Sequence, residues 1–304
     1  MLPAILTTLL WGCSAICAAR SARIVGGGPA NLARMIVAAV LLGICAHTAG
    51  RNLLGGPALP WFIASGIVGF GLGDLAMFGA MQRVGPRLTM LLTHCLAAPL
   101  AAITEWFWLG TRLGSSEIAC ALVILGGVTL ALAPDRGLEI RRGDFWPGVL
   151  FGLGSACGQG FGSVLSRKAS VLTAVPDGIV GGIVSGATAA YERIVPGILV
   201  ALAFFLFTRR SSSPAGPGVW RRAWPWIIGN ALVGPSIGVA VYQWGVATTP
   251  TGILMPIVAT VPVLTQFLAW KIDGHQPTRR TVLGGVIAVA GVIALAVAGG
   301  KLRF

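Results

Sequence analysis

Charged residues are scarce in this chain of 304 residues. Only 10% of its residues are Asp, Glu, Lys or Arg, and just nine are acidic, whereas soluble domains carry about 25% charged residues. Hydrophobic residues make up 55% of the chain, and the mean hydropathy is +0.84. This balance excludes a soluble enzyme, and it excludes a disordered chain, which needs low hydrophobicity.

Motifs for catalysis and metal binding are also lacking. The six cysteines all fall inside apolar runs and none forms a CxxC pair, so neither a disulfide framework nor a metal site is expected. No HExxH or GxSxG motif occurs, and the glycine-rich residues 69–73 (GFGLG) are not followed by Gly-Lys-Ser/Thr. We therefore predict a protein that is not an enzyme and has no cofactor and no metal.

The net charge of +13 does not indicate a nucleic-acid partner. Lys and Arg occur in ones, twos and threes between apolar runs, and no amphipathic helix carries a basic stripe. Arginines in loops beside membrane spans explain the excess better.

Long apolar runs are what the chain has instead. Each is about 20 residues long, the length that crosses a bilayer as a helix. They fall at residues 2–19, 30–48, 60–81, 86–108, 115–133, 146–166, 188–208, 224–246, 250–271 and 281–299. The fold class predicted is an all-α, multi-pass protein of the cell (inner) membrane with ten transmembrane helices.

The third and eighth runs resemble each other. A shift of 165 residues superposes Pro60, Trp61, Ile63, Val68, Gly69 and Gly73 on Pro225, Trp226, Ile228, Val233, Gly234 and Gly238. We therefore expect two five-helix repeats, residues 1–133 and 146–304, joined by a loop at 134–145. Because five is odd, the second repeat enters the membrane from the opposite side, and inverted repeats are typical of alternating-access transporters.

The same region carries a family resemblance. Residues 73–87 (GDLAMFGAMQRVGPR), followed by 98–100 (APL) and 109–113 (LGTRL), resemble the third and fourth helices of EamA-type proteins of the drug/metabolite transporter superfamily. The resemblance covers nearly the whole chain and implies a ten-helix transporter. The chain departs from the family pattern after the fourth helix of each half, where the family usually has the Glu of a Gly-Glu-Arg sequence. Thr111 and His275 occupy these positions here, so no role is carried over to them.

Asp74 and His94 are the first candidate site residues. A carboxylate in the middle of a span costs several kcal/mol unless it is neutral, paired or facing a cavity. Asp74 and His94 lie at about equal distances from the turn between their spans, so a shared face would let them pair and exchange a proton near neutral pH. The alternative is that each only hydrogen-bonds a neighbouring helix.

Arg34 and Arg193 occupy matching places near the predicted starts of the second and seventh spans. They are candidates for gating or anchoring, and the alternative is that they snorkel to the interface. Glu192 is a third candidate. It is adjacent to Arg193 in the sequence, but adjacent residues of a helix do not face each other, so its partner would lie elsewhere. Glu105, near the end of its run, is expected at the interface.

Aromatic and amide residues inside the spans form a second group of candidates. Aromatic walls with a few polar groups suit amphipathic small molecules, and ordinary packing is the alternative. The residues are Trp11, Gln159, Asn230, Tyr242, Gln243 and Trp244.

Together these features predict a secondary transporter, with export as the expected direction. Its partners would be the lipid bilayer and a small organic metabolite, amino acid or amphipathic drug-like solute; the chain would be a monomer or weak dimer. Coupling to protons and substrate exchange stay open as energy sources. The alternatives are an intramembrane enzyme acting on lipid and a non-transporting membrane scaffold.

Overall fold

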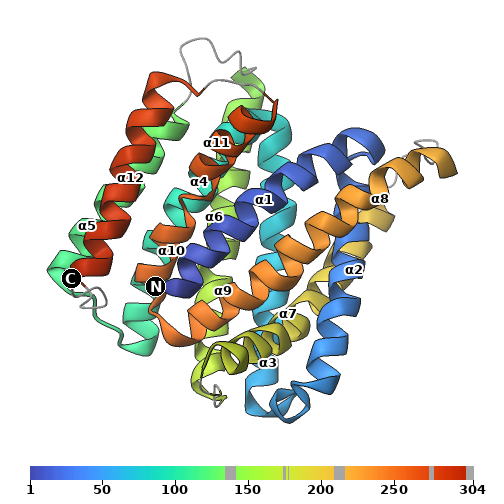
Figure 1. Ribbon diagram of the computed structural model, residues 1–304, viewed down its shortest axis with the longest axis horizontal. Helices are drawn as coiled ribbons and strands as arrows, with labels where there is room; N and C mark the ends of the chain where they lie inside the picture. Colours follow the sequence, from blue (N-terminus) through green and yellow to red (C-terminus); the bar gives the residue numbers. More distant parts are fainter. Residues whose placement is uncertain (134–141, 174–175, 177, 209–215, 274–276, 299–304) are drawn as a thin grey trace.

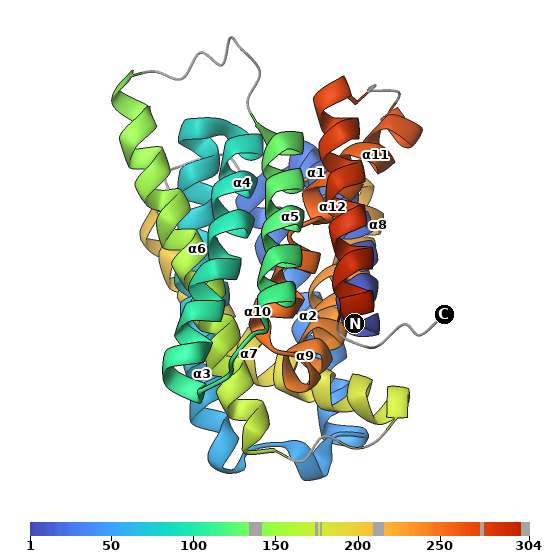
Figure 2. The ribbon, with the colours of Figure 1, turned by 90° about the vertical axis from the view of Figure 1, so that its left-hand side faces the viewer.

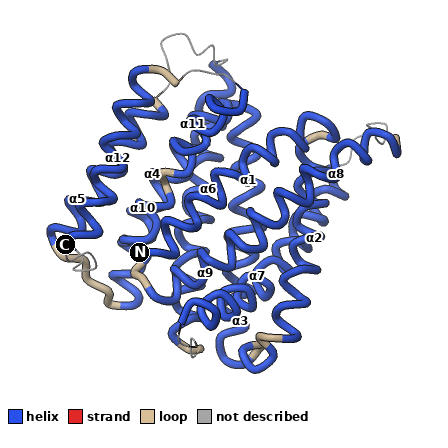
Figure 3. The backbone as a smooth tube through the Cα atoms, viewed as in Figure 1, coloured by secondary structure: helices blue, strands red, loops and turns tan. Residues whose placement is uncertain are grey.

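The computed structural model describes residues 1–133, 142–173, 176, 178–208, 216–273 and 277–298. Every regular element in these ranges is helical (Figure 3). The α-helices are α1 Leu2–Val25, α2 Gly27–Thr48, α3 Leu59–Gly66, α4 Asp74–Leu109, α5 Ser115–Leu132, α6 Arg142–Val171, α7 Gly178–Thr208, α8 Pro217–Ala231, α9 Ile237–Thr248, α10 Thr251–Val258, α11 Val261–Asp273 and α12 Arg279–Ala298. The predicted loop at 134–145 lies mostly outside the described residues.

These helices combine into ten segments that are long and apolar enough to cross a membrane, which confirms the predicted ten spans. They pack side by side as a bundle (Figure 1), and α1 begins at the end of the bundle where α12 ends (Figures 1 and 2). Gly85 divides α4 into two spans: its φ of 78° is a left-handed conformation that glycine adopts readily.

Two spans contain a π-helical turn. The turn η3 (Ile67–Gly73) joins α3 to α4, and the turn η4 (Leu232–Ser236) joins α8 to α9. Residues in π-helices are well under 1% of those in globular proteins, yet these two turns begin at positions that the 165-residue shift superposes. The agreement supports the predicted repeat, although the inverted relation of the two halves stays a prediction.

The seventh span begins earlier than the predicted run. The helix α7 starts at Gly178, ten residues before that run, and its first ten residues, GIVGGIVSGA, alternate apolar and small residues that the prediction did not include. Arg193 therefore lies fifteen residues from either end of α7 rather than near its start, which corrects the expectation that it could snorkel to the interface.

Close helix contacts depend on glycine. A Cβ at Gly158 of α6 would lie 2.5 Å from the Cα of Gly73, so the backbones of α6 and η3 touch at this point. Likewise a Cβ at Gly127 of α5 would lie 2.5 Å from the backbone nitrogen of Ala288 of α12, two helices that run side by side in Figure 2. Small residues at such crossings allow membrane helices to pack closely.

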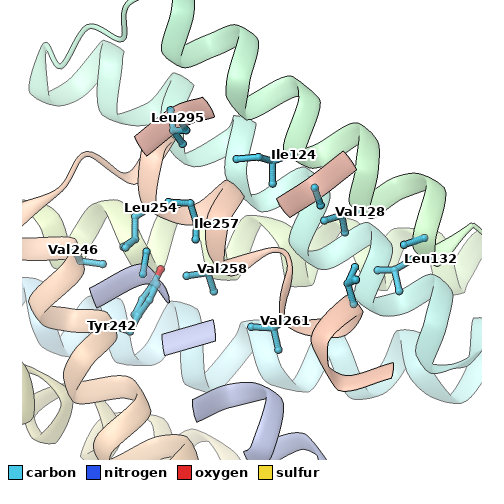
Figure 4. Close-up of a cluster of buried hydrophobic side chains, with 14 residues drawn as sticks. Ile124, Val128, Leu132, Tyr242, Val246, Leu254, Ile257, Val258, Val261 and Leu295 are labelled. Atoms are coloured by element: carbon cyan, nitrogen blue, oxygen red, sulfur yellow. The ribbon is translucent and has the colours of Figure 1, made fainter. Parts of the chain in front are cut away.

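Two apolar clusters flank the middle of the bundle. In the first, side chains of α5, α9, α10 and α12 meet, among them Ile124, Tyr242, Ile257 and Leu295 (Figure 4). The second joins α2, α7 and α9 through Met35, Ile194 and Ala240 with their neighbours. Two of the polar and aromatic residues described next contact these clusters: Tyr242 belongs to the first, and Trp11 packs against both.

Candidate functional site

Asp74 is the first residue after the π-helical turn η3, a kind of turn that occurs frequently at functional sites. Its Oδ1 accepts a hydrogen bond of 3.2 Å from the amide Nε2 of Gln159 on α6. The guanidinium groups of Arg34 and Arg193 are its charged neighbours. The close approach of Gly73 to Gly158 brings these two spans near enough for the bond to Gln159.

Arg193 is an almost fully buried arginine, only 5% exposed, in the middle of α7. Its guanidinium lies over the ring of Phe70, 5.1 Å from the centroid, and a Cβ at Gly69 would be 3.2 Å from its Nη2. Its Nε has no hydrogen-bond partner, and its charged or polar neighbours are Asp74 and Tyr242. A buried N–H without an acceptor is costly, so the Nε of Arg193 is a donor that an anionic group could satisfy.

Arg34 belongs to a hydrogen-bond network that joins α1, α2 and α8. Its Nε donates to Oδ1 of Asn31 at 2.7 Å on α2, and its Nη1 donates to Oδ1 of Asn230 on α8 at 3.5 Å. The same Asn230 oxygen accepts a 2.6 Å hydrogen bond from Ser14 on α1. Asn230 therefore holds Arg34 from the second half of the chain.

Tyr242 supplies a hydroxyl to the same region. Its oxygen lies 2.6 Å from the hydroxyl of Ser163, which also donates to the backbone carbonyl of Gln159 at 2.6 Å. Since a serine hydroxyl has a single hydrogen, Tyr242 is the donor of the pair. The ring of Trp11 covers Tyr242 with centroids 5.1 Å apart.

The residues that meet here are called the central polar cluster. They come from α1, α2, α4, α6, α7, α8 and α9, and thus from both predicted repeats. They are Trp11, Arg34, Asp74, Gln159, Arg193, Asn230 and Tyr242. Seven of the eleven residues that the sequence singled out are therefore connected, each through a contact or an electrostatic interaction with at least one other member.

His94 does not join the cluster. It is half-buried in α4, and no hydrogen bond or ion pair to it is found in the described ranges. The groups around the Asp74 carboxylate are Gln159, Arg34 and Arg193 instead. Equal depth in neighbouring spans made a pair with Asp74 plausible, but the two side chains do not pair in this conformation.

Three other candidates lie outside the cluster. Oε1 of Glu192 accepts a 2.6 Å hydrogen bond from the backbone N–H of Gly55 and so ties α7 to the loop before α3. Trp244 packs against Gly182 on α7. Gln243 is buried with both side-chain polar atoms unpartnered, beside a cavity of about 10 Å³ between α7 and α9.

Glu105 was expected at the interface but is 1% exposed. Its Oε2 accepts from the backbone N–H of Thr251 at 2.6 Å and from the Thr251 hydroxyl. Its Oε1 lies 3.5 Å from Nε of Arg167, whose Nη1 donates to the carbonyls of Val246 and Ala247 at 2.7 and 2.5 Å. We call Glu105, Arg167 and Thr251 the end clasp.

The end clasp joins α4, α6 and α10 close to one end of the bundle. Sequence reasoning missed it, although a signal existed. Glu105 and Arg167 are opposite charges that each stand four residues before the end of their helix, and those ends lie on the same side of a membrane.

No cluster of three or more His, Cys, Asp or Glu that could hold a metal ion is found in the described part of the chain. The central polar cluster instead offers two guanidiniums, one carboxylate, amides, a phenol and an indole. Groups of these kinds provide the hydrogen bonds and charges that orient small molecules in binding sites.

Comparison with known proteins agrees with the fold. The family model described as the EamA-like transporter family matches residues 1–133 and 146–297. A solved structure titled "Crystal structure of protein" shares a TM-score of 0.77 and 21% identity with the chain, over 100% of this chain and 98% of that one; at this identity it shows the fold alone. No curated protein matches. The family match covers nearly the whole chain, which is therefore a multi-pass membrane protein that belongs to the EamA-like transporter family, of the drug/metabolite transporter superfamily.

Proposed function

We propose that this protein is a secondary transporter that moves a small organic solute by alternating access, with the solute bound at the central polar cluster. The observation that carries the proposal is the convergence of Arg34, Asp74 and Arg193 between spans of both halves. Charged groups inside a membrane are costly and mark solute or ion pathways. Membership in a transporter family supports the same interpretation.

The charges of the cluster favour a solute with a carboxylate. Two guanidiniums interact electrostatically with one aspartate, and Arg193 has an Nε without an acceptor. A solute carboxylate would offset this uncompensated positive charge, since arginine binds carboxylates with paired hydrogen bonds. Trp11 and Tyr242 add an aromatic wall, which suits an apolar or aromatic side group.

Asp74 would bind the other end of a zwitterion. An ammonium group near its carboxylate competes with a proton for the same negative charge, so the solute and the proton displace each other. Movement of a proton one way would then drive the solute the other way, which gives proton-driven export of amino-acid-like solutes. A solute with only a carboxylate would instead bind together with the proton, because protonated Asp74 no longer offsets the guanidiniums.

The end clasp would act as a gate in this cycle. Glu105 and Arg167 hold α4, α6 and α10 together at one end of the bundle, and a second tie joins Glu192 to Gly55 at that end. Alternating access requires one end to separate while the other closes. These polar contacts can break and reform more readily than a packed apolar seam.

The test is solute counterflow in proteoliposomes of purified protein. Vesicles are loaded with one unlabelled compound each from a panel of neutral amino acids, monocarboxylates and monoamines, and uptake of the labelled compound is measured. We expect counterflow with amino acids, weaker counterflow with monocarboxylates and none with monoamines. Flux of monoamines alone would overturn the carboxylate assignment. Absence of flux for every class would favour a non-transporting scaffold.

A further inference from the structure

An apolar groove opens on the outer side of the bundle, away from the central polar cluster. It is lined by residues of the second part of α4, the loop after it, α5 and α10. Its volume is about 560 Å³, within the range of about 300–1,000 Å³ that ligand clefts have. Neither Asp74 nor Arg193 lines it, so it is separate from the proposed solute site.

The groove runs along α4, from the loop that follows this helix toward the middle of the span. Its outer end is formed by the loop between α4 and α5, which includes Thr111 and Arg112. From Trp106 to Ala98 it follows α4 for eight residues, or about 12 Å at 1.5 Å per residue. Trp106 is 50% exposed near its mouth, the depth at which tryptophan anchors to the interface.

The charge of the groove lies at its outer end only. Arg112 is exposed, and it makes no hydrogen bond or ion pair within the residues that the structure describes. The acidic residue nearest to Arg112 in sequence is Glu117. Its carboxylate accepts a 2.8 Å hydrogen bond from the backbone N–H of Gly114 and caps α5. Deeper positions such as Ile103, Leu122 and Pro256 are apolar.

Gly252 forms the back wall of the groove. A Cβ there would lie 2.5 Å from Cδ1 of Leu113 and 3.0 Å from Cβ of Ala102, so glycine lets α10 approach α4 and the loop. Its neighbour Thr251 belongs to the end clasp. The back wall is therefore held in place by buried polar contacts, and the groove is a feature of the packed fold.

We propose that this groove is a binding site for one anionic phospholipid. The phosphate lies at Arg112 in the interface, and one acyl chain lies along α4 and α5 toward Ala98. The groove has a single cation at its outer end and apolar residues along the rest of its length. This pattern matches a molecule with one anionic head and an apolar tail.

The experiment uses the full-length protein in vesicles that contain phosphatidylglycerol or phosphatidylcholine, each with a photoactivatable group in one acyl chain. After irradiation, labelled peptides are identified by mass spectrometry. In wild-type protein, phosphatidylglycerol should label peptides of α4, α5 and α10 in preference to other helices, and unlabelled phosphatidylglycerol should compete better than phosphatidylcholine.

Arg112→Gln should reduce the preference for phosphatidylglycerol about fivefold, the effect expected for one arginine near an anionic surface. Arg112→Lys should retain most of it, since lysine also attracts phosphate. Arg51→Gln is the matched control: Arg51 is also exposed, in the loop after α2 on the same side of the bundle.

Labelling spread evenly over all lipid-facing helices, or a preference unchanged in Arg112→Gln, would overturn the proposal. Ala121→Phe tests the groove independently, because it fills the space between α4 and α5; Val286→Phe, at an exposed position on α12, is its control. If Ala121→Phe does not fold, the Arg112 series decides. Crosslinks between two protein chains at these peptides would show that a second copy occupies the groove instead.

Discussion

The side-chain amide of Gln159 donates a hydrogen bond of 3.2 Å to the carboxylate of Asp74, across 85 residues of chain. Gln159 belongs to α6, the first helix after the predicted connecting loop, and Asp74 follows the π-helical turn in the first half. The bond therefore crosses between the two halves whose relative motion the proposed mechanism requires. It can break when Asp74 is protonated or binds a solute amine.

Asp74→Asn should abolish proton-driven uphill transport while leaving the protein folded. Asparagine is nearly isosteric and can still accept a hydrogen bond from Gln159, but it cannot carry a proton between the two sides. The measurement is flux in proteoliposomes with and without a pH gradient. His94→Ala is the control, because His94 has no polar contact with Asp74, and it should keep the uphill flux. Uphill transport by Asp74→Asn at the wild-type rate would remove Asp74 from the coupling.

Arg193→Gln should weaken solute binding by about 10–100-fold, because a hydrogen bond to a charged group contributes about 1.5–3 kcal/mol. The loss should be seen for amino acids and monocarboxylates alike, as a raised half-saturation concentration in counterflow. Arg51→Gln removes an exposed cation outside the cluster and should leave this concentration unchanged. Equal half-saturation in Arg193→Gln and wild type would mean that the carboxylate binds elsewhere.

The end clasp should be measurable as an energetic coupling. Removing one partner of a buried ion pair leaves the other uncompensated, so Glu105→Gln and Arg167→Met should each lower the thermal unfolding temperature in detergent. The double variant should lose less free energy of unfolding than the two single variants together. The difference, the coupling energy, should be about 0.5–3 kcal/mol. Additive losses would show that the 3.5 Å contact contributes nothing.

Gly158→Ala should reduce both stability and transport. The new Cβ would lie 2.5 Å from the Cα of Gly73, so α6 must move away from η3, and the bond between Gln159 and Asp74 would lengthen. Overpacking of this kind costs about 1–3 kcal/mol, which a melting curve in detergent can detect.

Gly126→Ala is the matched control for this variant. Gly126 also lies inside a helix, but a Cβ there meets nothing within 4 Å, and alanine favours helix over glycine by about 0.5–1 kcal/mol. It should be neutral or stabilising and should transport normally. If Gly158→Ala melts and transports like Gly126→Ala, the close approach of α6 to η3 is not needed for the site.

The spans were predictable from the sequence because a bilayer imposes a local requirement. Each crossing needs about 20 apolar residues in one stretch, so hydropathy alone located all ten. The one large boundary error was at α7, whose first ten residues, rich in glycine, were left out of the predicted run. Asp74 was also predictable as a candidate, since an acid in an apolar run stands out without knowledge of its neighbours.

Which side chains interact with one another, in contrast, was decided by the tertiary structure. The depth of a residue follows from its position in a span, but the direction of its side chain depends on helix rotation, and that rotation is set by contacts such as Gly73 with Gly158. Depth alone therefore favoured His94 as the partner of Asp74. In the packed structure, Asp74 interacts with Gln159, Arg34 and Arg193 instead. The end clasp shows the same cause: the sequence determined that Glu105 and Arg167 stand near helix ends, and only the packing of α4, α6 and α10 brought them together.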